Sequence, residues 1–434
     1  MKIASVADLN EQEVRGKNAL VRVSFDAFDK DGTIKDSLRL EASEGTIRAL
    51  KKKGARRIIL MSYAGRPDGF DPSLSLRPVA DFLFGLFKEK VHFVPAKPCI
   101  SAAAYVQLVR EYLNAKMEDG EVVLLENLRF WKEENEGSDA FAKDAASLGE
   151  IYVQDGFAQS HRIKNATVGG ITKYLKVKVA GIQFAKEVSY LSGTYKNLTK
   201  QERGPYIFII AGKKVETKPG IVSKITVVNK LMDSMRNGDK VLIGGAVAYP
   251  FIAARAFNGA PASIGDVRKV IGDSFIEEDQ IAEHIRMAQE IFGKGAAKNI
   301  DVVLPRDHVV KSGSSVVTVD KILPGMSAAD IGADTVGEWK KYFQGADTIV
   351  LAGPVGWYEN PLFSEGSRQI TNAIADETKG GTVTIAAGGD SSSMVRKFGR
   401  GADFSLLSIG GGATLEFLMQ GWLPVMDLLD RKAI

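Results

Sequence analysis

Residues 382–393 read TVTIAAGGDSSS, and this stretch indicates the fold class. Its first part, Thr382–Ala386, is a short run of apolar and β-branched residues, which is typical of a buried strand. Two glycines and then Asp390 and Ser391 follow, and they predict a tight turn that opens a helix. A strand, a glycine turn and a helix in succession favour a parallel sheet covered by helices.

The same succession recurs along all 434 residues. Between the apolar runs lie helical patterns, such as Val79, Phe82, Leu83, Leu86 and Phe87 at the spacing of one helix face. About ten strands over this length predict an α/β protein with two doubly wound, Rossmann-like parallel sheets. Besides Thr382–Ala386, the predicted strands are Ala19–Val23, Arg57–Met61, Glu121–Leu125, Ile151–Val153, Tyr206–Ile210, Lys240–Ile243, Asp301–Leu304, Thr348–Leu351 and Phe404–Leu407.

The predicted domains meet at a polar segment that is helical at first and then rich in turn residues. We expect this connecting helix and hinge over residues 184–200. An N-terminal domain is expected over residues 1–183, and a C-terminal domain over residues 201–416.

Composition excludes several classes of protein. Charged residues make up 25% and hydrophobic residues 45%, and the net charge of +4 is spread along the chain, so no nucleic-acid partner is indicated. The single Cys99 excludes internal disulfides and a cysteine-rich zinc site, and it fits a reducing cytoplasm. No apolar run approaches 18 residues and the N-terminus has no apolar signal region, so membrane and secreted proteins are not expected.

Four arginines follow predicted strands in the first half of the chain: Arg39, Arg66, Arg129 and Arg162. The carboxyl ends of parallel strands meet at one edge of a sheet, where ligands of this fold class bind. Guanidinium groups gathered there would bind a small polyanion, because their geometry matches phosphate and carboxylate oxygens. The alternative is that each arginine is a solvated surface residue.

In the second half, glycines follow the strands instead, at Gly388-Gly389 and at Gly410-Gly411. Glycine turns let backbone N–H groups approach phosphate oxygens at a helix N-terminus, although tight turns require glycine in any case. Asp390 could hold a divalent metal carried by a nucleotide.

Two further features of this half suit a nucleotide. Lys214 and Lys218 follow the strand Tyr206–Ile210, and as a pair they would suit phosphoryl transfer, or they belong to a lysine-rich loop. Trp357-Tyr358-Glu359 is well placed for a nucleoside, although aromatic residues more often serve packing. Phosphate-loop, dinucleotide and protein-kinase signatures are missing, and the four histidines lack metal-ligand spacing.

Read in order, these segments resemble phosphoglycerate kinase over nearly the whole chain. VRVSFD stands where the family has V-R-V-D-F-N, and AGGDS stands where it has G-G-G-D-T. Ten ordered matches lie at residues 21–26, 62–67, 125–130, 155–162, 211–218, 243–249, 330–332, 352–359, 387–391 and 408–416.

The resemblance implies a two-lobed, hinge-bending kinase whose first lobe binds phosphoglycerate and whose second binds ATP or ADP with Mg²⁺. It implies that residues 417–434 pack back onto the first lobe. Arg39 and Lys214 would be catalytic, and Arg66, Arg129 and Arg162 would clamp the substrate's own phosphate. The implied nucleotide contacts are Lys218, Ala328, Glu359, Gly388, Gly389, Asp390, Ser391, Gly410 and Gly411, with Asp390 at the metal.

The substrate-binding segments depart from the family pattern at three positions: Ser24 replaces an Asp, Asp26 an Asn and Tyr63 a His. Asp26 shares a strand face with Ser24 and would bring a negative charge near an anionic substrate. Tyr63 keeps a hydrogen-bonding tip but cannot become cationic. In the nucleotide half, Lys213 stands where a small residue is usual.

We therefore expect a cytoplasmic, monomeric enzyme that reversibly transfers the 1-phosphoryl group of 1,3-bisphosphoglycerate to ADP. Three alternatives stay open: a kinase of this fold acting on another small phosphorylated carboxylate, a non-catalytic nucleotide- or protein-binding relative, and a nicotinamide dehydrogenase. The last lacks its dinucleotide fingerprint.

Overall fold

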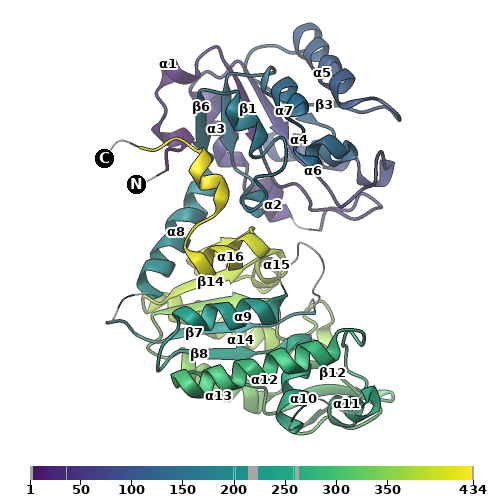
Figure 1. Cartoon of the computed structure of the whole chain (residues 1–434), viewed down its shortest axis with the longest axis vertical. Coiled ribbons are helices and arrows are strands. Elements are labelled where there is room, and N and C mark those ends of the chain that lie inside the picture. The colour runs from purple at the N-terminus through teal and green to yellow at the C-terminus, as the bar shows by residue number, and fades with distance from the viewer. Residues whose placement is uncertain are drawn as a thin grey trace. The chain divides into compact units, whose positions relative to one another are not determined.

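A computed structural model describes residues 3–35, 37–198, 200, 202–213, 223–257, 259 and 263–432. The chain forms two units, Met1–Tyr190 with Trp422–Ile434, and Leu191–Gly421. Each unit contains a six-stranded sheet whose neighbouring strands all pair in parallel (Figure 1). The predicted fold class, two parallel-sheet α/β domains, is confirmed. Among the described residues, no helix combines the length and the apolar character that crossing a bilayer requires.

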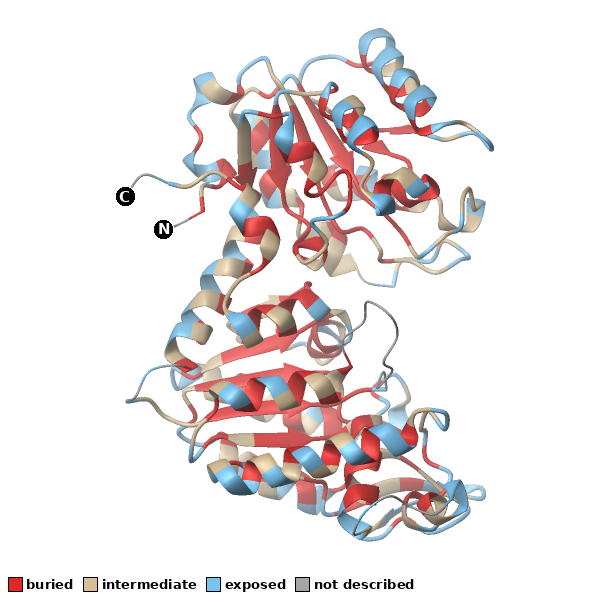
Figure 2. Ribbon diagram, viewed as in Figure 1, coloured by how far each residue is buried: buried red, intermediate tan, exposed pale blue. Residues whose placement is uncertain are grey.

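The sheet of the first unit has the strand order β3-β4-β2-β1-β5-β6. Its strands are β1 (Asn18–Arg22), β2 (Arg57–Met61), β3 (Val91–Val94), β4 (Glu121–Leu125), β5 (Ile151–Gln154) and β6 (Val177–Ala180). Every residue of β2 is buried, because helices cover the sheet, and Figure 2 shows the strands of this unit mostly in red. The helices of this unit include α1 (Glu11–Val14), α2 (Ser37–Glu41), α3 (Glu44–Lys52), α4 (Arg77–Phe87), α5 (Ala102–Lys116), α6 (Lys132–Glu136) and α7 (Asp139–Ala146).

The sheet of the second unit has the order β15-β14-β13-β7-β8-β9. Its strands are β7 (Tyr206–Ile210), β8 (Lys240–Ile243), β9 (Asp301–Val303), β13 (Thr348–Ala352), β14 (Val383–Ala387) and β15 (Leu406–Ser408). Its helices include α9 (Lys224–Ser234), α10 (Ala248–Ala256), α11 (Ile264–Ile271), α12 (Ile281–Lys298), α13 (Ala333–Phe343), α14 (Glu365–Lys379), α15 (Gly389–Lys397) and α16 (Gly412–Gln420).

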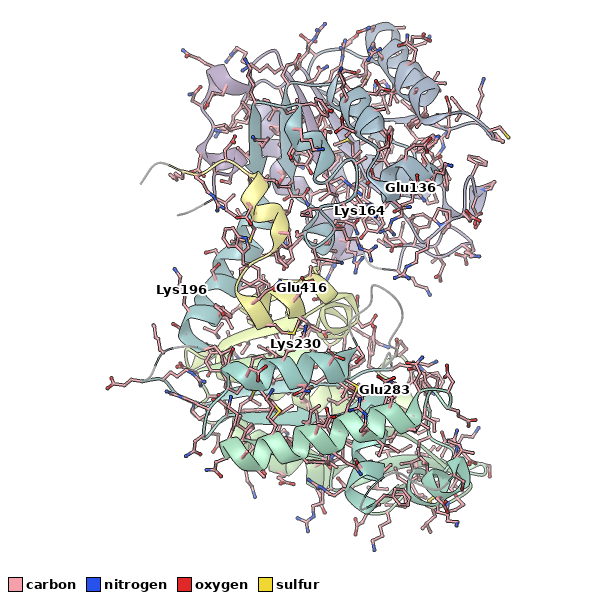
Figure 3. All side chains as sticks on the ribbon, viewed as in Figure 1. Glu136, Lys164, Lys196, Lys230, Glu283 and Glu416 are labelled. Atoms are coloured by element: carbon pink, nitrogen blue, oxygen red, sulfur yellow. The ribbon has the colours of Figure 1, made fainter. Side chains whose placement is uncertain are left out.

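These helices are amphipathic. Trp339 of α13 and Ile370 of α14 pack with Ile349 of β13 in one apolar cluster. On α9 and α12 the exposed side carries charge, as Lys230 and Glu283 show in Figure 3.

A small antiparallel sheet was not predicted. It has the order β11-β10-β12, from β10 (His308–Ser312), β11 (Ser315–Val319) and β12 (Met326–Ile331). Asp330, at the end of β12, accepts hydrogen bonds from Ile331 N (2.9 Å) and Gly366 N (2.7 Å), and so ties this sheet to α14.

The C-terminal segment contributes to the first unit. Asp430 N donates to Lys178 O over 2.8 Å, and Val425 N donates to Ser160 O over 3.2 Å. Between the units the chain runs through α8 (Ile182–Leu198), and the division at Tyr190 falls within this helix. The residue limits expected at 183, 200 and 416 stay predictions.

Asp155 follows β5 and contacts the first turn of α8. Its Oδ1 accepts a hydrogen bond from Phe184 N over 3.1 Å, and its Oδ2 has no partner among the described residues. Burial raises the pKa of this carboxyl from its ordinary value of 3.8 to about 6. The native state therefore binds this proton more tightly than the unfolded chain, and ionisation of Asp155 destabilises the fold as the pH rises from about 4 to about 6.

Replacing Asp155 with asparagine removes this charge and keeps an oxygen for Phe184 N. We expect the variant to gain about 1–3 kcal/mol over the wild type at about pH 8, relative to the same difference at about pH 4. Urea unfolding at both pH values measures this. An equal difference at both would show that the native carboxyl titrates as it does in the unfolded chain.

Candidate functional site

Arg129 lies at the centre of a group of cationic side chains in the first unit. It stands in a single helical turn after β4, where Asn127 Oδ1 accepts a hydrogen bond from its N–H over 3.1 Å. Its guanidinium lies 4.0 Å from the centroid of the Tyr63 ring, and its Nη1 donates to Gly65 O over 2.6 Å. Burial, with the charges of Arg162 and Arg22 nearby, lowers the pKa of Arg129 to about 10, so it stays cationic at neutral pH.

Two other predicted arginines take part in this group. Arg162 is half-buried, and its Nε donates to His161 Nε2 over 3.2 Å. Burial, together with the charges of Arg162 and Arg129, lowers the pKa of His161 to about 4, so His161 is neutral at physiological pH. Arg39, on α2, donates from Nη1 to Asp26 O over 3.1 Å.

Arg66 is exposed and follows Gly65. The Gly65 N–H donates a hydrogen bond to Asp26 Oδ1, and the Gly65 carbonyl accepts one from Arg129 Nη1. The structure thus brings Arg129 and Arg162 together and links Arg39 to them through Asp26 and Gly65. Arg66 lies in the same loop as Gly65, and its side chain is exposed.

Of the three residues that depart from the family pattern, Asp26 and Tyr63 contact this group of arginines. Ser24 is buried, and its hydroxyl has no hydrogen-bond partner among the described residues. Asp26 Oδ1 accepts from Gly65 N over 3.0 Å, so its carboxylate holds the loop that carries Arg66. The centroid of the Tyr63 ring lies 5.3 Å from the guanidinium carbon of Arg22 and 4.0 Å from that of Arg129. The Tyr63 ring therefore makes cation–π interactions with two arginine side chains.

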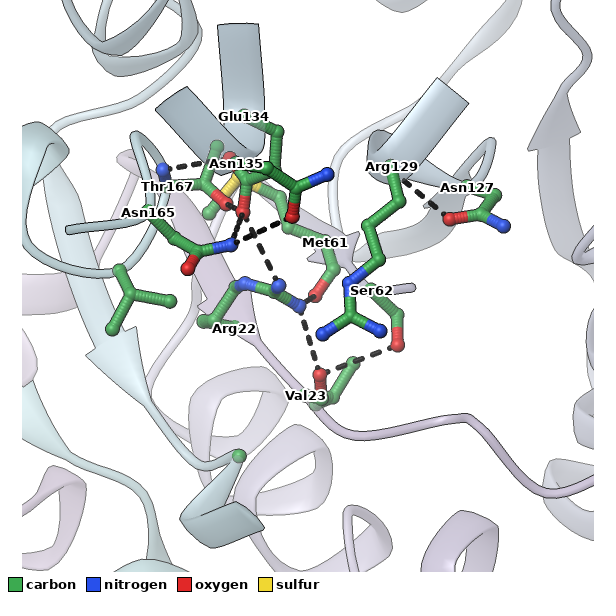
Figure 4. Close-up of polar contacts among 12 residues, drawn as sticks. Arg22, Val23, Met61, Ser62, Asn127, Arg129, Glu134, Asn135, Asn165 and Thr167 are labelled. Carbon is green, nitrogen blue, oxygen red and sulfur yellow. Dashed lines mark hydrogen bonds and ion pairs between the residues drawn. The ribbon is translucent and has the colours of Figure 1, made fainter. Parts of the chain in front are cut away.

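An ion pair beneath this group was not predicted. Arg22, at the end of β1, is fully buried, and its Nη2 lies 3.4 Å from Glu134 Oε1 (Figure 4). Its Nη1 donates to Met61 O and Val23 O, each over 3.1 Å. Glu134 in turn accepts from Thr167 N (2.9 Å) and Thr167 Oγ1 (2.8 Å). The only local signal was an arginine inside the apolar run ALVRV.

In the second unit, the two predicted glycine turns lie beside each other. Gly388, with a φ of 99°, precedes α15, and Gly411, with a φ of 55°, precedes α16. A Cβ on Gly388 would lie 3.3 Å from Gly411 Cα, so the backbones of the two turns are in close contact. Two helix N-termini therefore begin at neighbouring turns, and the positive ends of their dipoles favour a phosphate chain there.

The side chains that follow Gly388 and Gly389 have different surroundings. Ser391 is buried, and its hydroxyl donates to Ala387 O (3.2 Å) and accepts from Gly353 N (2.7 Å). Asp390 is exposed and lines a cavity of about 560 Å³. Of the other predicted residues, Ala328 and Glu359 also line this cavity. A single carboxylate suits Mg²⁺ that arrives with phosphate oxygens, and no cluster of three or more His, Cys, Asp or Glu side chains fit for a metal occurs in the described ranges.

Lys214 and Lys218 lie outside the described residues. Another lysine, Lys224, was not predicted, although it opens α9 directly after the N-cap Ser223. Its Nζ donates to Ala211 O and to Ala352 O (3.3 Å), at the carboxyl ends of β7 and β13. A cation in the first turn opposes the helix dipole, and that is the sequence signal that could have identified it.

Comparisons with known proteins agree in one family. The family model described as phosphoglycerate kinase matches residues 9–421. The phosphoglycerate kinase of Prosthecochloris aestuarii is 37% identical over 430 residues, covering 97% of this chain and 98% of the relative. That of a Nostoc species is 35% identical over 437 residues, covering 99% and 100%.

Two solved structures are similar over 98% of both chains. Phosphoglycerate kinase from Pyrococcus horikoshii has a TM-score of 0.79 at 25% identity. The structure of phosphoglycerate kinase from Coxiella burnetii has a TM-score of 0.72 at 29% identity.

Proposed function

Because this chain belongs to the phosphoglycerate kinase family, we propose that it transfers the 1-phosphoryl group of 1,3-bisphosphoglycerate to ADP, reversibly and with Mg²⁺. The observation that carries this proposal is the group of guanidinium side chains around Tyr63 in the first unit. A small anion with a phosphate and a carboxylate matches such a group. We further propose that the enzyme is a cytoplasmic monomer, as its family resemblance implies.

In this proposal, Arg66, Arg129 and Arg162 bind the phosphate that the substrate keeps, and Ser24, Asp26 and Tyr63 contact the rest of it. Arg39 donates to the phosphoryl group in transit. Phosphoryl transfer depends on positioning and charge neutralisation more than on covalent catalysis, and a guanidinium provides both.

In the second unit, Glu359 contacts the ribose, Ala328 the nucleoside, and the turns at Gly388-Gly389 and Gly410-Gly411 donate N–H groups to the phosphates. Asp390 holds Mg²⁺, which supplies charge neutralisation at the phosphate oxygens when bound. Ser391 shapes the turn through its bonds to Ala387 and Gly353. As the family resemblance implies, Lys214 stabilises the phosphoryl group in transit and Lys218 contacts a nucleotide phosphate. Lys224 adds positive charge at the carboxyl ends of β7 and β13.

A steady-state assay with 3-phosphoglycerate and MgATP tests the proposal. We expect turnover at millimolar 3-phosphoglycerate. Nucleotide binding without turnover would instead indicate a relative that acts on another phosphorylated carboxylate, and the absence of both would overturn the proposal.

Asp26 sets a specific expectation for the substrate. Asp26→Asn keeps the oxygen that accepts from Gly65 N and removes a negative charge beside an anion. The KM for 3-phosphoglycerate should fall about 3- to 10-fold, with kcat and the KM for ATP unchanged, because the effect is on ground-state binding. The matched control is Asp31→Asn, an exposed carboxylate of the same loop. A rise in KM for Asp26→Asn would show that the carboxylate itself binds the substrate.

A further inference from the structure

The strand β11 forms one edge of the small antiparallel sheet, and its first four residues are exposed. It pairs with β10 on one side, and on the other side it has no partner strand among the described residues. Edge strands are usually protected from pairing with other chains by charged residues, prolines or bulges. Residues 312–319 read SGSSVVTV and contain neither charge nor proline. This edge therefore lacks the usual protection.

The opposite edge of the same sheet, along β12, is protected. Met326 O accepts a hydrogen bond from Asp273 N over 2.8 Å. Ala328 N donates to Ser274 Oγ over 3.1 Å, and Ala328 O accepts from Tyr249 Oη over 2.7 Å. Backbone groups along β12 are thus bonded within the chain, so only the β11 edge can accept a further strand without losing bonds.

The turn between β10 and β11 determines which backbone groups of β11 lack partners. It has a two-residue loop, Gly313-Ser314, in which Gly313 has a φ of 59°. In such a hairpin the residues that flank the loop exchange backbone hydrogen bonds, and bonded and non-bonded pairs alternate from there. Every second residue of β11, beginning with Ser315, therefore bonds to β10. The N–H and C=O groups of Val316 and Thr318 point away from β10, and no other described residue bonds to them.

One face of this sheet carries a row of apolar side chains that ends in an exposed residue. Val310 of β10 lies opposite Ala328 of β12 and opposite Val317 of β11. Val310 and Ala328 are buried, whereas Val317 is 42% exposed. A further strand beside β11 would cover Val317 and extend the row, and this is favourable because apolar surface is removed from water.

A second copy of β11 fits this edge by symmetry. Placed antiparallel, with Val317 opposite Val317 of the second copy, it brings Val316 opposite Thr318 in both halves of the pair. Each outward N–H then meets an outward C=O, as an antiparallel ladder requires. No charged side chain opposes another, since Asp320 falls opposite Ser314 of the second copy.

We propose that two copies of this chain associate through β11, so that their three-stranded sheets join across a two-fold axis at Val317. The dimer is closed, because both of its outer edges are β12, whose backbone groups are already bonded. A pair of five-residue strands buries less than the roughly 1,600 Å² of a standard interface, so the association is weak. In dilute solution the chain stays the monomer of the proposed function.

Sedimentation velocity of the full chain between about 1 and about 300 μM tests this, because we expect a Kd on the order of 100 μM, as for small transient interfaces. Thr318→Pro should weaken the dimer at least about tenfold, since it removes an N–H that faces the second copy and none that β10 uses. Phosphoryl-transfer activity should stay at the wild-type level, because β10 separates β11 from β12, the strand that lines the nucleotide cavity.

A charge exchange at Val317 tests the two-fold axis itself. Val317→Lys and Val317→Glu each place like charges opposite one another, so each variant alone should stay monomeric. An equimolar mixture of the two should form a dimer at least as tight as that of the wild type, because opposite charges then meet. The matched control is Phe84→Lys on α4, an exposed apolar residue of the other unit, which should leave the association unchanged. Far-ultraviolet circular dichroism verifies that each variant is folded.

Three results would overturn the inference. The first is a wild type that stays monomeric at about 300 μM, where a Kd near 100 μM predicts substantial dimer. The second is a dimer that Thr318→Pro and Val317→Lys leave intact, since its interface would lie on another surface. The third is a mixture of the Val317 variants that stays monomeric, which excludes antiparallel pairing about Val317. A dimer without phosphoryl-transfer activity would contradict only the proposed function.

Discussion

Replacing Arg39 with alanine is expected to lower kcat about 10²- to 10³-fold, with the KM values changed by less than about threefold. The guanidinium is oriented by its bond from Nη1 to Asp26 O, and its planar set of N–H donors matches the geometry of phosphate oxygens. In the proposed function these donate to oxygens of the migrating phosphoryl group, where negative charge must be stabilised during transfer. An interaction made mainly in the transition state affects kcat more than KM.

The controls distinguish charge from geometry. Arg39→Lys keeps the positive charge but loses the planar fork, so its kcat should fall between those of the wild type and Arg39→Ala. Arg48→Ala removes an exposed arginine of α3 that pairs with Glu44, and it should leave the kinetics unchanged. An increase in the KM for 3-phosphoglycerate with normal kcat would place Arg39 in the substrate clamp. Unchanged activity would favour a role for the chain outside this reaction.

The central strands of both sheets could be predicted from the sequence. Arg57–Met61, Glu121–Leu125, Tyr206–Ile210 and Lys240–Ile243 match β2, β4, β7 and β8 residue for residue. These strands are buried on both faces, so their apolar runs are continuous and end where the burial ends. The helix face at Val79, Leu83 and Phe87 lies in the core of the first unit for the same reason.

Several strands at the margins were missed, although the edge strands β9 and β15 were predicted as Asp301–Leu304 and Phe404–Leu407. β11 is exposed over nearly its whole length, and its sequence SVVTV carries no alternation that distinguishes it from a loop. β3 and β6 are edge strands of four residues, each with neighbours on one side only. A short strand with one covered edge does not need a long apolar run, so its pattern is weak.

Some residues of the candidate sites could likewise be predicted from the sequence, and others could not. Residues directly after strand ends, such as Arg129 and Asp390, could be placed because the topology brings those ends together. The pairing of Arg22 with Glu134 could not, since the two residues are 112 positions apart and Glu134 lies in an unremarkable charged helix. The exposed Trp357 was noted, but its support by Phe363 depends on a turn whose geometry the sequence does not specify.

The buried pair Arg22–Glu134 should have the largest effect on stability. Arg22→Met leaves the Glu134 carboxylate fully buried, without its cation. An ion pair broken on one side costs about 3–5 kcal/mol of unfolding free energy, because the remaining charge has lost its solvent and its partner. Chemical denaturation measures the loss. The exposed pair Arg15–Glu11 is the matched control, and Arg15→Met should cost less than about 1 kcal/mol.

A double variant tests whether the unpaired charge of Glu134 causes the loss of stability in Arg22→Met. Glu134→Gln in the Arg22→Met background removes the charge and keeps an oxygen for Thr167 N and Thr167 Oγ1. At least half of the lost stability should return, because burying a neutral, hydrogen-bonded polar group costs far less free energy than burying an unpaired carboxylate. If the double variant were as unstable as Arg22→Met alone, the cost would lie instead in the bonds that Arg22 makes to Met61 O and Val23 O. Arg22 would then stabilise the strand ends beneath Arg129, and the ion pair would be secondary.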